Sequence, residues 1–303
     1  MPRPKIIVIL GPTASGKSNI AVAIAKKFNG EIISADSRQV YKGLDIGTGK
    51  ITKKEMAGVP HHLLSVADPR KQFTVTDDQT LTNLAIARIV NIGKAPIICG
   101  GTGFYISALL GEINIPEAKP NKMLRKQLEK KSIAELFEIL QKLDPVRAGN
   151  IDRQNPRRLV RAIEVAKTLG SVPELPIRNS KSEIRNKFKI LKIGIKLGKE
   201  ELRKRINERL GSRIKKGMID EAKQLYEHGL SYKRMRELGL EYRRLADFFE
   251  GKISKRELIT LLQNEIWQYA KRQMTWFKRD KNILWFPPSI KKVEKEVKNF
   301  LKM

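Results

Sequence analysis

The feature that most constrains this chain is the motif GPTASGKS at residues 11–18, which follows an apolar segment and precedes an Ala- and Ile-rich one. Between a strand and a helix, the pattern G-x-x-x-x-G-K-S/T predicts a phosphate-binding loop. Its glycines let backbone N–H groups turn toward an anion, and the helix N-terminus adds positive potential. We therefore predict an α/β fold with a site for a di- or triphosphate.

The motif assigns the phosphate contacts residue by residue. Lys17 adds a point charge, and the Ser18 hydroxyl can hold Mg²⁺. The other members of the predicted phosphate-binding set are Gly11, Thr13, Ala14, Ser15 and Gly16. A glycine-rich turn without a ligand is the alternative, and the full match between a predicted strand and a predicted helix argues against it.

Composition indicates the class of protein. With 303 residues, 41% hydrophobic and 31% charged, the chain is typical of a soluble globular protein with one large or two modest domains. No apolar stretch approaches the roughly 20 residues that span a bilayer, and the N-terminus leads directly into a predicted strand, which leaves no room for a signal peptide. The single cysteine, Cys99, excludes an internal disulfide, and with only this cysteine and three histidines (His61, His62 and His228) we do not expect a structural zinc site. We expect a cytoplasmic protein.

Net charge is the second strong feature. The chain has 61 Lys and Arg against 32 Asp and Glu, a formal charge of +29, and residues 1–116 contain only 14 of these basic and 8 of these acidic residues. The excess therefore lies after the phosphate-binding part, where it would attract a polyanion. A lysine-rich surface of the thermophile type would carry matching acidic residues, which are missing. We favour nucleic acid as the partner.

Apolar segments predict the core. Residues 5–10, 31–35 and 95–99 are typical of buried parallel strands, and helical patterns lie between them at 19–28 and 77–91. Alternation of strands and helices predicts a doubly wound parallel sheet.

From residue 116 the pattern becomes helical. A capping box at 132–135 begins one helix, and an Asn-Pro start at 155 with Gly170 at the end bounds another. The polar, Pro-bearing residues 171–187 predict a loop. Together, residues 116–188 predict an all-helical insertion.

The chain then returns to the core. Residues 188–197 alternate as a strand, and a further helix is expected around 258–279. Between them, apolar residues every four positions predict one long basic amphipathic helix: Leu202, Ile206, Leu210, Ile214 and Met218. The predicted domains are a core of residues 1–115 and 189–303 and the insertion.

Asp36 is the one acidic residue at the end of a predicted core strand. It follows the second strand, on the edge where open α/β sheets bind ligands. It could serve Mg²⁺ or act as a base facing the phosphate site, and the alternative is a helix N-cap.

Three further motifs are weaker alone. The GGTG turn at 100–103 could offer N–H groups or the Thr102 hydroxyl to a reacting group, or could be a tight turn only. Arg157, Arg158 and Arg161 share one helix turn, which favours phosphate contact over a solvated basic face. Residues 269–279 interleave basic and aromatic side chains that could stack bases, although core packing is the simpler role for the aromatics. For His61 and His62, packing or a hydrogen bond is expected, because no third metal ligand lies at suitable spacing.

Taken together, the motifs resemble those of the tRNA dimethylallyltransferases (isopentenyl-tRNA transferases). The matching segments run in order along nearly the whole chain: GPTASGKS at 11–18, IISADSRQVY at 32–41, GLDIGT at 43–48, PHHL at 60–63, DP at 68–69, GGTGFY at 100–105, RRLVRAIE at 157–164 and YAKRQMTW at 269–276. The phosphate-binding loop is widespread, whereas DSRQVY, GGTGFY and AKRQ together are specific.

The resemblance implies prenyl transfer from dimethylallyl diphosphate to N6 of an adenosine next to the anticodon of a tRNA. It implies Asp36 as general base, with Lys17 and Thr102 also catalytic, Mg²⁺ as cofactor, and Arg205 as an arginine that reaches the diphosphate. A diphosphate in the loop would explain why the third strand has no terminal acid, and a stacked base must be flipped to react.

The resemblance also implies tRNA contacts, with the insertion gripping the anticodon stem-loop. The implied tRNA-binding residues are Asp36, Ser37, Arg38, Gln39, Thr102, Arg125, Arg157, Arg158, Arg161, Arg236, Arg243, Lys271 and Arg272. We expect no membrane association and a monomer.

Two departures and three alternatives accompany this prediction. The register around residues 236–243 differs from the usual motif, and Trp267 stands where relatives commonly carry a basic residue. The alternatives are an isopentenyltransferase for free adenine nucleotides, a small-molecule or nucleoside kinase, and an inactive RNA-binding scaffold. The large basic surface argues against the first, and the presence of both Lys17 and Asp36 argues against the last.

Overall fold

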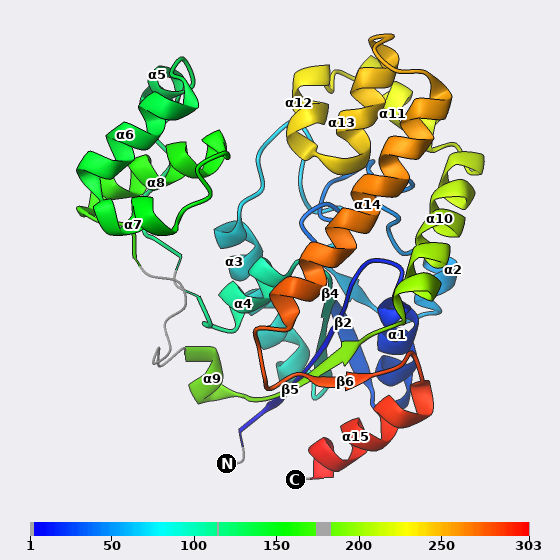
Figure 1. Cartoon of the computed structure of the whole chain (residues 1–303). Helices are drawn as coiled ribbons and strands as arrows, with labels where there is room; N and C mark the ends of the chain where they lie inside the picture. Colours follow the sequence, from blue (N-terminus) through cyan, green and yellow to red (C-terminus); the bar gives the residue numbers. More distant parts are fainter. Residues whose placement is uncertain (1–2, 114, 174–182, 303) are drawn as a thin grey trace. The chain divides into compact units, whose positions relative to one another are not determined.

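A computed structural model describes residues 3–113, 115–173 and 183–302 of the chain. The chain divides into two compact units, residues 1–110 with 181–303 and residues 111–180. The larger unit contains the sheet, the phosphate-binding loop and both termini (Figure 1).

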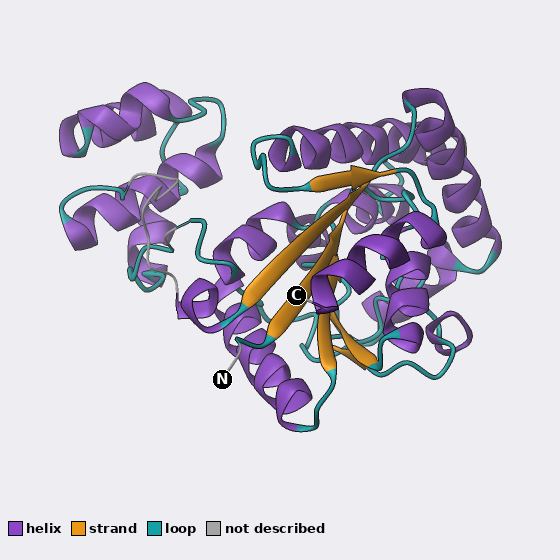
Figure 2. Ribbon diagram, turned by 90° about the horizontal axis from the view of Figure 1, so that it is seen from below, coloured by secondary structure: helices purple, strands orange, loops and turns teal. Residues whose placement is uncertain are grey.

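Six parallel strands form one sheet in the larger unit, in the order β3-β2-β4-β1-β5-β6, with helices on both faces (Figure 2). The strands are β1 (Lys5–Leu10), β2 (Gly30–Ala35), β3 (His61–His62), β4 (Ala95–Gly100), β5 (Lys189–Ile195) and β6 (Leu284–Phe286). The four central strands are buried, which is why they are apolar runs. The predicted doubly wound core is confirmed, and the two short edge strands were missed.

Helices of the larger unit cover the sheet and its carboxyl edge. They are α1 (Lys17–Lys27), α2 (Lys53–Met56), α3 (Val75–Asn91), α4 (Gly103–Leu109), α9 (Glu183–Lys187), α10 (Lys199–Lys215), α11 (Met218–Glu227), α12 (Tyr232–Leu238), α13 (Leu240–Phe249), α14 (Lys255–Phe277) and α15 (Ile290–Lys302). Among the helices of the described ranges, none is both long and apolar enough to cross a bilayer.

Side chains alternate between two cores along β1. Ile7 and Ile9 pack with α1 and α15, whereas Ile6 and Val8 pack with α3 and α4. A third core joins α10 to α14 with Tyr41 and its neighbours after β2. This third core holds a layer of helices against the loops that follow the strands.

Two expectations for the larger unit were wrong. The helix predicted through Met218 is divided, because Gly217 adopts φ +95° and separates α10 from α11. The apolar repeat continues across this break because both helices pack on the same core. Part of the loop predicted at 171–187 is helix α9, and residues 174–182 lie outside the described residues.

The smaller unit is helical throughout its described secondary structure. Its helices are α5 (Lys122–Leu128), α6 (Ile133–Leu143), α7 (Pro145–Asn150) and α8 (Pro156–Leu169). The predicted capping box at Ser132 and the Asn155 cap are both present, and Gly170 ends α8 at φ +84°. The unit begins at residue 111 and ends at 180, whereas the sequence placed the insertion at 116–188.

Candidate active site

A pocket lies at the carboxyl edge of the sheet, where the loops after β1, β2 and β4 meet α10 and α14. Its polar lining includes Lys17, Ser18, Asp36, Arg38, Gln39 and Arg209. The predicted phosphate-binding loop and the predicted base therefore line one pocket, although they follow different strands.

The loop at 11–18 has the backbone that its sequence requires. Gly11 and Gly16 have positive φ angles, and a side chain at Gly11 would lie 2.5 Å from the carbonyl oxygen of Ile195. Ala14 also has positive φ, at 61°. The hydroxyl of Ser15 is fully buried and has no hydrogen-bond partner among the described residues. An unpaired buried donor inside such a loop fits an anionic ligand.

Lys17 lies within the pocket and donates from Nζ to the carbonyl of Pro12 over 3.1 Å. Burial lowers the pKa of Lys17, and the nearby Arg209 lowers it further, whereas Cys99 and Asp36 raise it. A desolvated cation beside a second cation favours an incoming anion, because the anion relieves both penalties.

Asp36 directly follows β2 and closes a tight turn. Its Oδ1 accepts hydrogen bonds from the backbone N–H groups of Arg38 (2.9 Å) and Gln39 (3.3 Å). No helix begins at Asp36, so it is not a helix N-cap. Its side chain forms an Asx turn with the residues that follow. Both hydrogen bonds are accepted by Oδ1, so the turn leaves Oδ2 without a hydrogen bond to these backbone groups.

Thr102 ties the two loops beside Asp36 together. Its Oγ1 accepts from the N–H of Ser37 over 3.1 Å, and Tyr269 of α14 lines the same pocket as Asp36. Burial raises the pKa of Tyr269 to about 12, so this phenol stays protonated at neutral pH. A side chain at Gly100 would overlap the Ala35 carbonyl, which explains the glycine there.

Three pocket residues were missed by the sequence analysis. Gln273 accepts from the N–H of Thr13 over 2.9 Å and donates to the carbonyl of Gly101 over 2.8 Å, so it joins two active-site loops. It belongs to the AKRQ motif, which supported the family resemblance and from which only Lys271 and Arg272 were assigned a role.

The other two are arginines of α10. Arg209 donates to the Thr13 hydroxyl (3.2 Å) and to the Gly49 carbonyl, and the buried Arg213 pairs with Glu241 (2.8 Å). A basic residue every four positions, beginning at Arg205, could have indicated this face.

Arg205 itself lies beside the phosphate-binding loop. Its guanidinium is 3.8 Å from the position that a side chain on Gly16 would take, and its Nε contacts Glu201 over 2.7 Å. The structure therefore brings Arg205 near the loop, one helical turn from Arg209.

In the smaller unit, the predicted tRNA contacts divide into two pairs. Arg125 and Arg161 both bind the fully buried carboxylate of Glu164, at 2.7 and 2.5 Å. Burial opposes ionisation of Glu164, and hydrogen bonds from Arg125 and the Asn121 N–H still lower its pKa. Arg157 and Arg158 are exposed on α8.

In the larger unit, the predicted tRNA contacts also differ in their partners. Arg236 is paired with Asp247 and Glu250, and Arg243 lies 3.5 Å from Glu265. These acids neutralise part of their charge. Lys271 and Arg272 are exposed on α14, and each lies 6.0 Å from the centroid of an aromatic ring.

Metal ligands of the usual kinds are sparse. Within the described ranges, no three His, Cys, Asp or Glu side chains are grouped to hold an ion. His61 Nδ1 contacts the Val59 carbonyl (2.8 Å) and His62 Nε2 contacts Glu31 (2.7 Å), so both histidines form the expected hydrogen bonds.

Comparisons with known proteins identify the family. Residues 39–280 match the family model described as IPP transferase. The chain belongs to the IPP transferase family. Within that family it is 40% identical to a tRNA dimethylallyltransferase of Anoxybacillus flavithermus over 93% of this chain and 90% of that sequence. It is 37% identical to one of Halalkalibacterium halodurans, over 99% and 97%.

Solved structures of the family agree. The full-length tRNA isopentenylpyrophosphate transferase of Bacillus halodurans superposes with a TM-score of 0.72 at 36% identity, covering 99% of this chain and 96% of that one. A eukaryotic dimethylallyltransferase acting on tRNA gives a TM-score of 0.77 at 26% identity, covering 94% and 74%. The predicted family and fold are thus confirmed.

Proposed function

We propose that this chain transfers the dimethylallyl group of dimethylallyl diphosphate to N6 of an adenosine next to the anticodon of a tRNA. The family membership supports the reaction. The observation that carries the proposal in this chain is that the phosphate-binding loop and the strand-end carboxylate of Asp36 line the same pocket.

The diphosphate end of the donor binds the loop at 11–18. The bond between the first prenyl carbon and the diphosphate oxygen breaks, and its electron pair leaves with the diphosphate. Lys17 and Arg209 stabilise the charge that develops there, because both cations already lie in the pocket without reorganisation. The hydroxyl of Ser15 is a further donor to this charge.

The acceptor nitrogen attacks the same carbon and then carries an extra proton. Asp36 accepts this proton, since its turn leaves Oδ2 available while Oδ1 keeps the side chain fixed. Thr102 holds the neighbouring loop in place through its bond with the Ser37 N–H. The adenine reaches this pocket only after it leaves its stack.

Mg²⁺ fits this site as an ion held mainly by its substrate. The Ser18 hydroxyl is an oxygen donor in the pocket, which suits a hard cation that keeps several water ligands. When bound with the diphosphate, Mg²⁺ would neutralise part of the leaving group's charge.

The basic surface supports a nucleic-acid acceptor over a free nucleotide. The formal charge is +29, and the exposed Arg157, Lys271 and Arg272 are available to phosphates, whereas the exposed Arg158 lies 3.7 Å from Asp152. A mononucleotide needs no such surface.

The deciding experiment incubates the protein with unmodified tRNA, labelled dimethylallyl diphosphate and Mg²⁺, followed by nucleoside analysis. Prenylated adenosine in the tRNA supports the proposal. Parallel reactions replace tRNA with AMP, or the prenyl donor with ATP. Prenylated AMP with unmodified tRNA, or phosphoryl transfer from ATP alone, would overturn it.

A further inference from the structure

We propose that Glu221 of α11 is a positioning residue for the donor pocket, because its carboxylate fixes the loop at 45–51 that forms one wall of the pocket. This inference rests on the proposed prenyl transfer. It concerns how tightly the donor is held and which donors fit.

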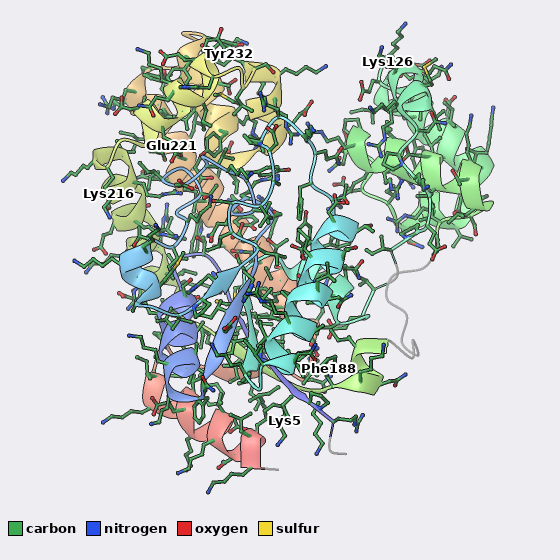
Figure 3. The ribbon with its side chains drawn as sticks, turned by 180° about the vertical axis from the view of Figure 1, so that it is seen from behind. Lys5, Lys126, Phe188, Lys216, Glu221 and Tyr232 are labelled. Carbon is green, nitrogen blue, oxygen red and sulfur yellow. The ribbon has the colours of Figure 1, made fainter. Side chains whose placement is uncertain are left out.

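Both oxygens of Glu221 are used. Oε2 accepts from the backbone N–H groups of Asp45 (2.9 Å) and Ile46 (2.6 Å), and Oε1 accepts from the N–H of Gly47 (2.9 Å) and the hydroxyl of Tyr242 (2.8 Å). Figure 3 labels Glu221 on its helix. Three consecutive N–H groups around one carboxylate form an anion-binding nest, and bonds to a charged acceptor are stronger than neutral ones.

Regular secondary structure gives this loop no support, and Lys50 ties only its end, through Nζ, to the Tyr41 carbonyl and the Ser65 hydroxyl. Residues 44–50 form turns without helix or strand, held internally by bonds such as the 2.8 Å bond from the Lys50 N–H to the Asp45 carbonyl. Such a segment takes its position from what it binds, since its backbone donors must find partners. Glu221 supplies those partners for three residues in a row.

The carbonyl side of the same loop is held by the arginines of α10. Arg213 donates to the Gly47 carbonyl and Arg209 to the Gly49 carbonyl, each over 2.7 Å. Arg209 also binds the phosphate-binding loop. The loop is therefore clamped between a carboxylate on its N–H side and guanidinium groups on its carbonyl side.

The fit around Gly47 is close. A side chain on Gly47 would lie 2.5 Å from the hydroxyl of Tyr242, which is itself buried. Burial raises the pKa of Tyr242, and the charge of Glu221 raises it further, so the phenol remains a donor.

The clamped loop places two side chains, Thr48 and Ile51, in the pocket wall. If the carboxylate of Glu221 is replaced by an amide, only one acceptor oxygen and no negative charge remain for the three N–H groups, and the wall is held less firmly. Arg209 then loses its partner at Gly49 as well. We expect weaker binding of the donor and acceptance of a longer one, with no effect on binding of tRNA.

The test compares Glu221→Gln with the wild type. We expect the KM for dimethylallyl diphosphate to rise about tenfold and the KM for tRNA to stay unchanged, because small displacements in a pocket are costly. Transfer from geranyl diphosphate should rise relative to dimethylallyl diphosphate. Tyr242→Phe, which removes one bond of four, should give a smaller effect in the same direction.

Glu227→Gln is the matched control. Glu227 lies on the same helix, exposed, and its nearest basic partner, Lys223, is 3.9 Å away. Its KM values should equal those of the wild type.

An unchanged donor KM in a folded Glu221→Gln protein overturns the inference. If that variant does not fold, Glu221→Asp keeps the charge on a shorter side chain. It should raise the donor KM without changing the tRNA KM, and equal values would overturn the inference too. Failure of the proposed function is distinct, because the wild type would then transfer no prenyl group.

Discussion

The guanidinium of Arg209 donates to the hydroxyl of Thr13 over 3.2 Å, although the two residues are 196 positions apart. Helix α10 is thereby joined directly to the phosphate-binding loop. Burial lowers the pKa of Arg209 and the neighbouring Arg213 lowers it further. A bound anion would therefore be stabilised by both guanidinium groups.

Replacing Arg209 with Met should weaken binding of the donor. The variant loses a charged donor to the diphosphate and the bond to Thr13, so we expect the KM for dimethylallyl diphosphate to rise about 10- to 100-fold. Steady-state kinetics with saturating tRNA measures this. Lys204→Met, an exposed change on the same helix, is the control. Equal donor KM values for both variants would contradict a role for Arg209.

The Asp36→Asn variant distinguishes the role of Asp36 as a general base from its role in holding the turn. The amide oxygen of Asn can still accept from Arg38 and Gln39, so the loop should keep its shape. The amide cannot take up the proton, and we expect kcat to fall by a factor on the order of 10² or more. Affinity for tRNA, measured by filter binding, should stay near the wild-type value. A wild-type kcat for Asp36→Asn would show that Asp36 is not the general base.

Much of this site could be predicted because its signals are local. The loop at 11–18 and the acid at 36 each lie directly after an apolar strand, and parallel strands bring their carboxyl ends to one edge. The capping box at Ser132 and the proline at the start of α8 can also be recognised from a few neighbouring residues.

The missed residues depend on contacts between distant segments. Gln273 reaches Thr13 across 260 positions, and Glu221 reaches Asp45 across 176. Gln273 lies in the AKRQ motif, but the motif alone does not predict these contacts, and nothing in the local sequence of Glu221 distinguishes it from a surface residue. Gly217 could have indicated the helix break, but the apolar spacing continues across it because α10 and α11 share a core.

Asp78 should make stability depend on pH. It is 1% exposed, its Oδ1 has no hydrogen-bond partner among the described residues, and burial, followed by the charge of Asp36, raises its pKa to about 7. An acid with a raised pKa in the folded state favours folding at low pH. Its contribution is present below its ordinary pKa of 3.8 and is lost as the pH rises through 7.

The test of Asp78 is the Asp78→Asn variant. Relative to the wild type, its free energy of unfolding should increase between pH 5 and pH 8, by an amount on the order of 1 kcal/mol or more. Urea unfolding at both pH values measures the difference. The same difference at pH 5 and pH 8 would show that Asp78 is ionised throughout this range.

Glu164→Gln should destabilise the smaller unit. The variant leaves Arg125 and Arg161 without their shared buried carboxylate, and breaking such a group costs about 3–5 kcal/mol. Hydrogen exchange of α5 and α8 should become faster, while exchange of β1 and β4 stays the same. Glu138→Gln, an exposed change on α6, is the control. Unchanged protection of α8 would mean that the carboxylate is not needed to hold these helices.

Two cationic side chains, Arg203 of α10 and Lys271 of α14, lie against the ring of Trp267. Arg203 and Lys271 each lie 6.0 Å from its ring centroid, both are exposed, and neither has an acidic partner among the described residues. We expect this group to contact tRNA phosphate, because the indole holds the two charges together. Arg203→Ala should weaken tRNA binding and reduce the slope of log affinity against log salt by about 1. The exposed Lys204→Ala change should alter the slope less, since no aromatic ring holds Lys204 in place. Equal slopes for the two variants and the wild type would place the tRNA elsewhere.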